Sequence, residues 1–318
     1  MDFLNCGRKF LMLAPMSGYS DSPLRRMCRR YGADACVGEF VHSRAVLSGA
    51  DKVLEKMRFE EGERPFGIQI FGSDEREMSE AAAFAAERFS PDFIDVNFGC
   101  PAHSAVGAGA GAALLRNVAQ MKRIVSAVSG AVRIAVTAKM RTGWDGGSVI
   151  VPRAALELEE AGAKMITLHG RTKSAGYEGP ADWGLIEKTA ESLRIPLVGN
   201  GSAESLSADA LRASACAGFM VGRAALGNPW VFAQMRARID GANPPAPASA
   251  AERLALALEY AEAVCSAGRS GISKENLTFA KSQIMRFIKG CEGFKKLRVQ
   301  MREADTLDEL KGLICRFC

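Results

Sequence analysis

Polar residues that could do chemistry recur directly after short apolar runs of this chain. The clearest is Cys100, in the loop Gly99-Cys100-Pro101 that follows the apolar run from Phe93 to Asn97. A thiol with an ordinary pKa of about 8.5 is mostly protonated at neutral pH, so it can donate a proton or, once ionised, act as a nucleophile. A place at the end of a predicted strand presents the thiol to a site. We therefore interpret Cys100 as functional and the other cysteines as structural.

A second group of candidates is cationic. Lys139 and Arg141 end one apolar run, and Arg171 follows another. Residues 96–144, 49 positions in all, contain no Asp or Glu but six Lys or Arg. Charge of one sign favours an anionic ligand, and a lysine at the end of a strand would stabilise the negative charge of a reduced flavin.

Glycines mark a third place. Gly199, Gly201 and Gly222 end or follow the last two predicted strands, and Arg223 comes next. Backbone amides after the last two strands of an α/β barrel commonly hold phosphate, glycine allows the close approach, and arginine adds a charged donor. The alternative is that these glycines only form tight turns.

These side chains converge only if the strands that carry them end at one place. Eight short β-rich runs alternate with helical patterns: Phe10 to Ala14, Ala33 to Val37, Phe66 to Phe71, Phe93 to Asn97, Ile134 to Met140, Met165 to His169, Pro196 to Gly199 and Gly218 to Val221. Helices are predicted at Pro23 to Tyr31, Glu75 to Arg88, Val118 to Val128, Pro152 to Ala161 and Ala203 to Ala213. Eight strands over roughly 230 residues predict a TIM (β/α)8 barrel, an α/β fold whose active site lies at the carboxyl ends of the strands.

The remainder of the chain differs in composition. Residues 241–250, GANPPAPASA, predict a Pro-rich linker, and residues 251–318 contain no proline and show helical periodicity. The predicted organisation is a catalytic barrel over residues 1–240, the linker, and a small all-helical C-terminal domain over 251–318. Six basic residues and one acid lie between Arg286 and Arg302, so this domain could contact nucleic acid, although a solvated surface explains most charge runs.

Composition excludes several classes of protein. The chain of 318 residues is 48% hydrophobic and 24% charged, with a net charge of +5, which is ordinary for a folded domain. No membrane span or signal peptide is predicted, and nine irregularly spaced cysteines indicate reduced thiols, so we expect a cytoplasmic protein. No metal site is predicted, because the one CxxC, Cys315 with Cys318, has no second pair.

Seven ordered motifs resemble those of the tRNA-dihydrouridine synthases, an FMN-dependent family, across nearly the whole chain. They are APMSGYSDSPLR, IQIFGSD, IDVNFGCP with GAGAALL, AKMRTGW, LHGRTKSAGYEGPADW, VGNGS and GFMVGRAALGNPW. The resemblance implies a barrel that carries FMN and a helical domain that grips tRNA. We expect a monomer without a stable protein partner.

The family pattern implies a role for each matching residue. The catalytic acid would be Cys100, and Asn97, Arg141 and Arg171 would bind the substrate. The residues implied for FMN are Pro15, Met16, Ser17, Gln69, Lys139, His169, Asn200, Gly201, Ser202, Gly222 and Arg223.

The implied reaction is an oxidoreduction of a CH–CH group. NADPH, or NADH as the alternative, reduces FMN, flavin N5 passes a hydride to C6 of a uracil, and Cys100 protonates C5. The target base would have to leave the stacked RNA to reach the pocket.

The chain departs from the family pattern in two places. Lysines usually follow the catalytic cysteine, where this chain has His103, Ser104, Gly107 and Ala108, and a Lys-His pair of the helical domain is replaced by Lys281 and Ser282. Three alternatives stay open: uridines of ribosomal RNA as the substrate, a free pyrimidine as in dihydroorotate dehydrogenases, and a non-catalytic RNA chaperone. A basic helical domain argues against the free base, and retention of Cys100 argues against the chaperone.

Overall fold

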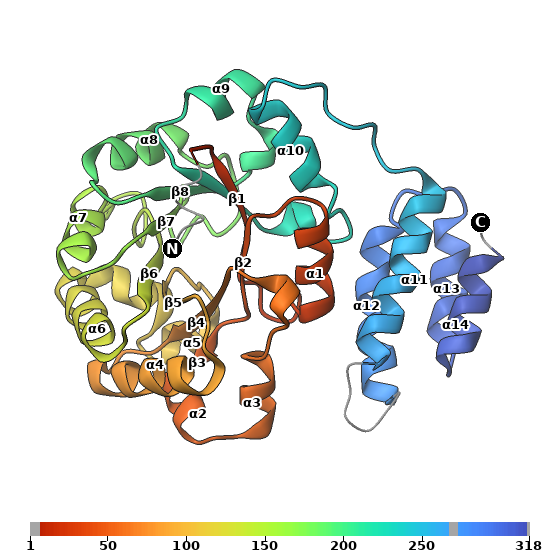
Figure 1. Ribbon diagram of the computed structural model, residues 1–318, viewed down its shortest axis with the longest axis horizontal. Helices are drawn as coiled ribbons and strands as arrows, with labels where there is room; N and C mark the ends of the chain where they lie inside the picture. The colour runs from red at the N-terminus through yellow and green to blue at the C-terminus, as the bar shows by residue number, and fades with distance from the viewer. Residues whose placement is uncertain (1–6, 267–272, 317–318) are drawn as a thin grey trace.

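The structure is a computed structural model and describes residues 7–266 and 273–316. Eight of its strands run parallel and form a closed barrel in the order β2-β1-β9-β8-β7-β6-β5-β4, which pairing between β2 and β4 closes (Figure 1). They are β1 Phe10–Leu13, β2 Ala35–Val37, β4 Phe66–Phe71, β5 Phe93–Phe98, β6 Ala135–Arg141, β7 Ile166–His169, β8 Leu197–Asn200 and β9 Gly218–Val221. The predicted TIM barrel and all eight predicted strands are confirmed. A short further strand, β3 Val41–His42, pairs with β4.

Helices surround the barrel. They are α1 Ser22–Arg30, α2 Ser43–Leu47, α3 Asp51–Lys56, α4 Glu75–Phe89, α5 His103–Gly107, α6 Val118–Ala131, α7 Arg153–Glu160, α8 Trp183–Ser192, α9 Ala208–Ala213 and α10 Val231–Ile239, with 3-10 turns η2 Glu61–Glu63, η3 Gly111–Arg116, η4 Ala203–Ser205 and η5 Arg223–Ala225. Four of them begin at an Asp or Asn whose side chain accepts the backbone N–H three residues on: Asp21, Asp74, Asn117 and Asp182. This cap satisfies an amide that the helix leaves unpaired.

One predicted helix was wrong in extent. The segment from Ala203 to Ala213 is split into η4 and α9, because the Ser207 side chain accepts the Ala210 amide and starts a new helix. The spacing of apolar residues alone does not reveal such a break, whereas a serine in the middle of the segment, which can cap a helix, does indicate it.

The interior of the barrel contains an apolar cluster and a row of polar side chains. Phe10, Met12, Val37, Met165 and Met220 belong to one buried cluster inside the barrel. The middle of β4, β5 and β6 instead carries buried polar side chains, and the register places them in one row: Gln69 opposite Asp95, and Asp95 opposite Thr137. A polar row inside a barrel must be satisfied by its own members, because water does not reach it.

Four helices follow the barrel, α11 Ala250–Ser266, α12 Lys274–Phe287, α13 Phe294–Glu303 and α14 Leu307–Cys315, and they pack together beside α1 (Figure 1). Residues 240–249 between α10 and α11 lie in neither helix nor strand. The small C-terminal helical domain predicted from the sequence is confirmed as part of the fold.

Specific contacts attach these helices to the barrel. The buried Tyr260 hydroxyl donates to Asp21 at 2.5 Å, and Arg30 makes two 2.8 Å bonds with Glu259. Burial in this contact raises the pKa of the Asp21 carboxyl to about 6, and the hydrogen bond from Tyr260 opposes that shift. The helical domain is thus docked directly on the first helix of the barrel.

Candidate functional site

The carboxyl ends of the barrel strands meet at one mouth, and the predicted site residues other than Gln69 lie at or directly after those ends. Gln69 lies in the middle of β4 and is fully buried. Cys100 is 8% exposed in the loop after β5. Its amide and that of Gly99 donate to Asn97 Oδ1 at 2.8 and 2.9 Å, so the Asn97 side chain holds the loop in place. Gly111, at φ +57, packs against the Cys100 backbone, where an added Cβ would lie 3.0 Å from its carbonyl oxygen.

The surroundings of the Cys100 thiol favour its protonated form. Burial raises its pKa above the ordinary value, while the positive charges of Arg141 and Lys139 oppose that shift. A raised pKa keeps the sulfur protonated at neutral pH, as an acid requires and a thiolate nucleophile does not.

Lys139 lies near the end of β6, inside the mouth. Its ammonium donates to Asn200 Oδ1 at 3.2 Å, and Asn200 Nδ2 donates to the Met220 carbonyl at 2.8 Å, so the amide links β6, β8 and β9. Burial lowers the pKa of Lys139 to about 8, with Arg141 adding to the shift and Asp95 opposing it. An anion placed beside this amine would restore its charged form.

His169 is neutral at every ordinary pH. Burial first, and then the charges of Lys139, Arg141, Arg171 and Arg223, lower its pKa to about 2. Arg171 Nη1 lies 3.2 Å from His169 Nε2, and because a guanidinium only donates, Nε2 accepts and Nδ1 carries the proton. Four cations around one neutral ring form a cluster that favours an anionic ligand.

The turns after β8 and β9 have the geometry expected of an anion cradle. Gly201 has φ +116 and Ser202 φ +53, a left-handed conformation that is strained for serine and is found at functional sites. Among the described residues, the amides of Ser202 and Arg223 have no hydrogen-bond acceptor. A Cβ at Gly201 would lie 2.8 Å from Ala181 Cβ, so glycine is required there for space as well as for conformation.

The loop after β1 reaches the same end of the barrel. Met16 lies beside Gly222, where an added Cβ would be 3.7 Å from Met16 Sδ. Ser20 Oγ both accepts the Met16 amide at 2.8 Å and donates to its carbonyl at 3.1 Å. Pro15 and the exposed Ser17 belong to this loop.

Two predicted substrate-binding residues brace loops. Arg141 is 2% exposed and donates to the carbonyls of Gly99, Thr172 and Gly176 at 2.8 to 3.0 Å. Arg171 donates to the Gly179 carbonyl at 2.8 and 3.0 Å. Both guanidiniums therefore fix the shape of the mouth, whatever else they bind.

Sequence reasoning missed Tyr177 and Asp95. Tyr177 is 52% exposed and its ring lies 4.0 Å from the Arg223 guanidinium carbon and 5.4 Å from that of Arg141. It comes from a loop without periodicity, so its place at the mouth has no local signal. Asp95 alternates with Asn97 along β5, and that period of two placed both inside the barrel.

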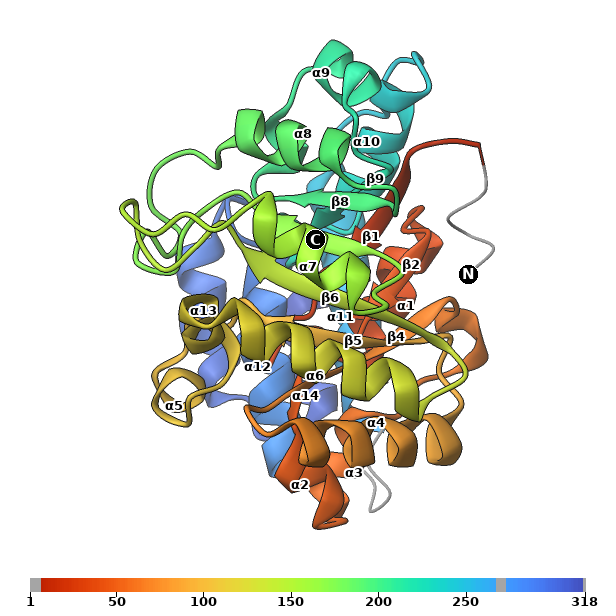
Figure 2. The ribbon, with the colours of Figure 1, turned by 90° about the vertical axis from the view of Figure 1, so that its left-hand side faces the viewer.

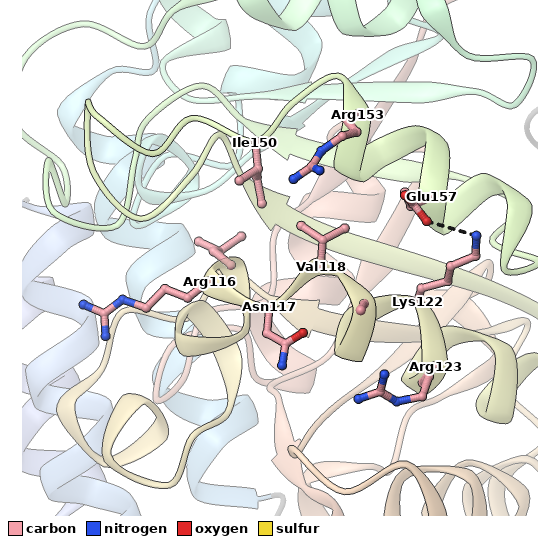
Figure 3. Close-up of a pocket in the computed structure, with 10 residues that line it drawn as sticks. Arg116, Asn117, Val118, Lys122, Arg123, Ile150, Arg153 and Glu157 are labelled. Carbon is pink, nitrogen blue, oxygen red and sulfur yellow. Dashed lines mark ion pairs between the residues drawn. The ribbon is translucent and has the colours of Figure 1, made fainter.

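A groove of about 520 Å³ lies outside the mouth between α6 and α7 and contains none of the predicted site residues (Figure 3). It is lined by Arg116, Lys122, Arg123 and Arg153, and Lys122 pairs with Glu157 at 2.9 Å. Arg116 also stacks on Trp144, 3.3 Å from its ring centroid. The groove is a basic surface and not an enclosed site.

No described helix is both long and apolar enough to cross a bilayer.

Comparison with known proteins identifies the family. The family model described as dihydrouridine synthase matches residues 12–315. A probable tRNA-dihydrouridine synthase of Rhodobacter capsulatus is 40% identical and covers 80% of each chain, and one of Aquifex aeolicus is 32% identical over 96% of this chain and 95% of its own. Among solved structures, a phosphonopyruvate hydrolase matches with a TM-score of 0.50 at 18% identity, over 85% of this chain and 97% of its own, which shows a shared barrel fold only. The chain belongs to the dihydrouridine synthase family.

Proposed function

We propose that this protein is an FMN-dependent tRNA-dihydrouridine synthase that uses Cys100 as its acid. The observation that carries the proposal is the meeting, at one barrel mouth, of a thiol with a raised pKa and four cations that surround a neutral histidine. Saturating the 5,6 double bond of a uracil needs a hydride at one carbon and a proton at the other. This mouth offers an acid and a place for an anionic cofactor within one site.

The residues present fit FMN. The amides of Ser202 and Arg223, which have no acceptor among the described residues, suit its phosphate, and Lys139 suits the anionic edge of its reduced ring. Gln69, Asn200 and the loop Pro15 to Ser17 would complete the cradle. When bound and reduced by NADPH, FMN would supply the hydride for C6 of the uracil.

The chain's own side chains would carry out the remaining work. Cys100 would hold the proton and deliver it to C5, and a proton from the solvent would then restore the thiol. Asn97 fixes the loop that carries the thiol, and the second hydrogen of its Nδ2 would reach the target uracil. Arg141 and Arg171 would shape the pocket around the base and add positive charge.

The surface of the helical domain supports a large substrate. Exposed cations on α12 and α13 and at the turn between them, among them Arg286, Lys289, Lys296 and Arg298, give that domain a basic surface. Figure 2 shows α13 toward the same end of the barrel as α5, the helix that directly follows the Cys100 loop, and Figure 1 shows that α13 lies on the far side of α11 from the barrel. A basic surface toward the end of the barrel that carries the mouth suits the phosphates of a large RNA such as tRNA, and the relatives named above carry tRNA in their names. A tRNA substrate would fit a cytoplasmic location, which we include in the proposal.

The experiment is a map of dihydrouridine in RNA from cells that lack this gene and from the same cells complemented with it. Loss of dihydrouridine at one or more tRNA positions, restored by the wild-type gene but not by Cys100→Ala, supports the proposal. Loss in ribosomal RNA alone would move the substrate to that RNA. Unchanged dihydrouridine at every position of both RNAs would overturn the proposal.

A further inference from the structure

Asp95 is a buried carboxylate at the centre of the barrel that the reaction itself does not use. It is 2% exposed and lies two positions before Asn97 on β5. It accepts the Thr137 hydroxyl from β6 at 2.5 Å and Gln69 Nε2 from β4 at 2.5 Å. Burial raises its pKa, whereas these two hydrogen bonds and the charge of Lys139 favour the ionised form.

A chain of hydrogen bonds leads from this carboxylate to Cys100. Gln69 Oε1 accepts from Asn97 Nδ2 at 2.7 Å. Asn97 Oδ1 in turn accepts the amides of Gly99 and Cys100 at 2.9 and 2.8 Å. Every member except the loop amide of Gly99 is buried, so water cannot replace a missing partner without cost.

The two ends of this chain fix the direction of everything between them. An ionised carboxylate can only accept, and a backbone amide can only donate. Gln69 must therefore turn its NH₂ group toward Asp95, and Asn97 must turn its NH₂ group toward Gln69. Only in that orientation does Asn97 present an oxygen to the two amides of the Cys100 loop.

We propose that Asp95 is a positioning residue, whose carboxylate sets the direction of the Gln69 and Asn97 amides and through them the position of the Cys100 thiol. A competing account gives Asp95 only a structural role, as one more polar group satisfied in the core. The two accounts differ in what happens when the polarity of the chain is reversed and not merely broken.

The single variants Asp95→Asn and Asn97→Asp disturb this chain in different ways. In Asp95→Asn the direction is no longer fixed from this end. The new side chain can present its oxygen to Gln69 and its NH₂ group to the Thr137 hydroxyl, or it can present a donor to Gln69, which reverses the chain and turns the Asn97 NH₂ group toward the loop amides. In Asn97→Asp the Gln69 amide lies between two carboxylates, so a buried polar group must lose its partner and the Cys100 loop is released.

The double variant Asp95→Asn with Asn97→Asp restores every bond in the opposite direction. The side-chain amide now at position 95 donates to Gln69 Oε1 and accepts from Thr137, and Gln69 Nε2 donates to the carboxylate now at position 97. That carboxylate accepts the amides of Gly99 and Cys100. The number of buried charges is unchanged, and the side chains keep nearly the same volume. A structural role for Asp95 alone offers no reason for the second substitution to repair the first.

The test measures alkylation of Cys100 by iodoacetamide at a fixed pH, followed by mass spectrometry of its peptide, together with thermal unfolding. We expect Asn97→Asp to expose the thiol and raise its alkylation rate by at least about fivefold, Asp95→Asn alone to raise it less, and the double variant to return to within about twofold of wild type, as coupled neighbours do. Thr137→Val, which removes a donor to Asp95 but leaves the carboxylate an acceptor, is the matched control and should keep the wild-type rate.

Two outcomes would overturn the proposal: a wild-type alkylation rate in Asn97→Asp, or a double variant no better than Asn97→Asp alone. If Asn97→Asp does not fold, recovery of folding in the double variant supports the same conclusion and its failure to recover contradicts it. Thiol alkylation needs neither cofactor nor RNA. The result is therefore distinguishable from failure of the proposed function. Only the catalytic importance of the thiol position rests on that function.

Discussion

At the scale of single residues, burial and charge at the mouth determine which protons are held. The Cys100 pKa is raised by burial, and the lysine beside it has a pKa lowered to about 8 for the same physical reason. Removing solvent disfavours the charged form of both groups, which keeps the thiol protonated and makes the charge of the amine sensitive to any anion that binds next to it.

The thiol should react slowly with alkylating agents. Because the thiolate is the reactive species and burial raises the Cys100 pKa, the iodoacetamide rate at pH 7 should be at least about tenfold below that of a free thiol. The rate should still be rising above a pH of about 9. Peptide mass spectrometry across a pH series measures it, and a plateau below a pH of about 8 would show instead that the thiol is ionised in the resting protein.

Affinity for FMN should fall with pH. Binding of an anion favours the protonated amine, and the fraction of protein with charged Lys139 decreases as pH rises through its pKa of about 8. We expect affinity of the apoprotein for reduced FMN, whose ring is anionic, to weaken by about tenfold between pH 7 and pH 9. An anaerobic titration with reduced FMN, followed by absorbance, measures it. Lys139→Met should bind more weakly and without this pH dependence, and an equal dependence in that variant would assign it to another group.

At the scale of elements, the loop after β9 is where the barrel meets the helical domain. Gly227 has φ +70, and a Cβ there would lie 2.5 Å from the Phe287 amide nitrogen of α12. The same helix reaches the loop after β1, where Gln283 donates to the Gly18 carbonyl at 3.2 Å and Arg286 donates to the Tyr19 hydroxyl at 3.0 Å. Helix α12 thus rests on two loops of the mouth.

Gly227→Ala should therefore loosen the docking of the helical domain. The substitution combines an unfavourable backbone conformation with a steric clash against backbone that cannot rotate away, and we expect a loss of about 2 kcal/mol or more in the free energy of unfolding. Gly146→Ala, where nothing lies within 4 Å, is the control and should change stability by less than about 0.5 kcal/mol. Denaturant unfolding compares them, and equal stability of the two variants would contradict the tight contact.

The elements show why some of the site was predictable from sequence and some was not. Alternating apolar runs predicted the strands, and the polar residues that end them predicted Cys100, Lys139 and His169, because a parallel barrel brings all strand ends to one mouth. Tyr177 and the polar row around Asp95 were missed. The position of Tyr177 depends on how a long loop folds back. The period of two along β5 indicates that Asp95 points inward, but its pairing with residues of β4 and β6 depends on the register between strands, which no local pattern encodes.

At the scale of the whole molecule, the proposed function assigns the chemistry to the barrel and a surface for the substrate to the helical domain. The helix α5, which follows Cys100, contains no lysine. Binding of RNA phosphate would therefore depend more on the basic surface of α13. The charges are exposed, and their attraction to phosphate should follow the salt concentration.

Replacing Lys296 and Arg298 by alanine should weaken tRNA binding and leave FMN content unchanged. Loss of two phosphate contacts should make the slope of log affinity against log salt shallower by about two. Arg133→Ala, exposed in the turn before β6 at the opposite end of the barrel, is the matched control. Filter binding over a salt series measures the slope, and identical slopes in the two variants would place the RNA elsewhere.

The most direct test is the reaction itself. Purified protein is reconstituted with FMN, supplied with NADPH and given tRNA isolated from cells that lack this gene, and dihydrouridine is measured by mass spectrometry. We predict that the wild-type protein forms dihydrouridine and that Cys100→Ala, with its FMN content intact, forms it at least about 100-fold more slowly. Dihydrouridine formation by Cys100→Ala at the wild-type rate would contradict the assignment of the acid, and none from FMN-loaded wild-type protein would contradict the function.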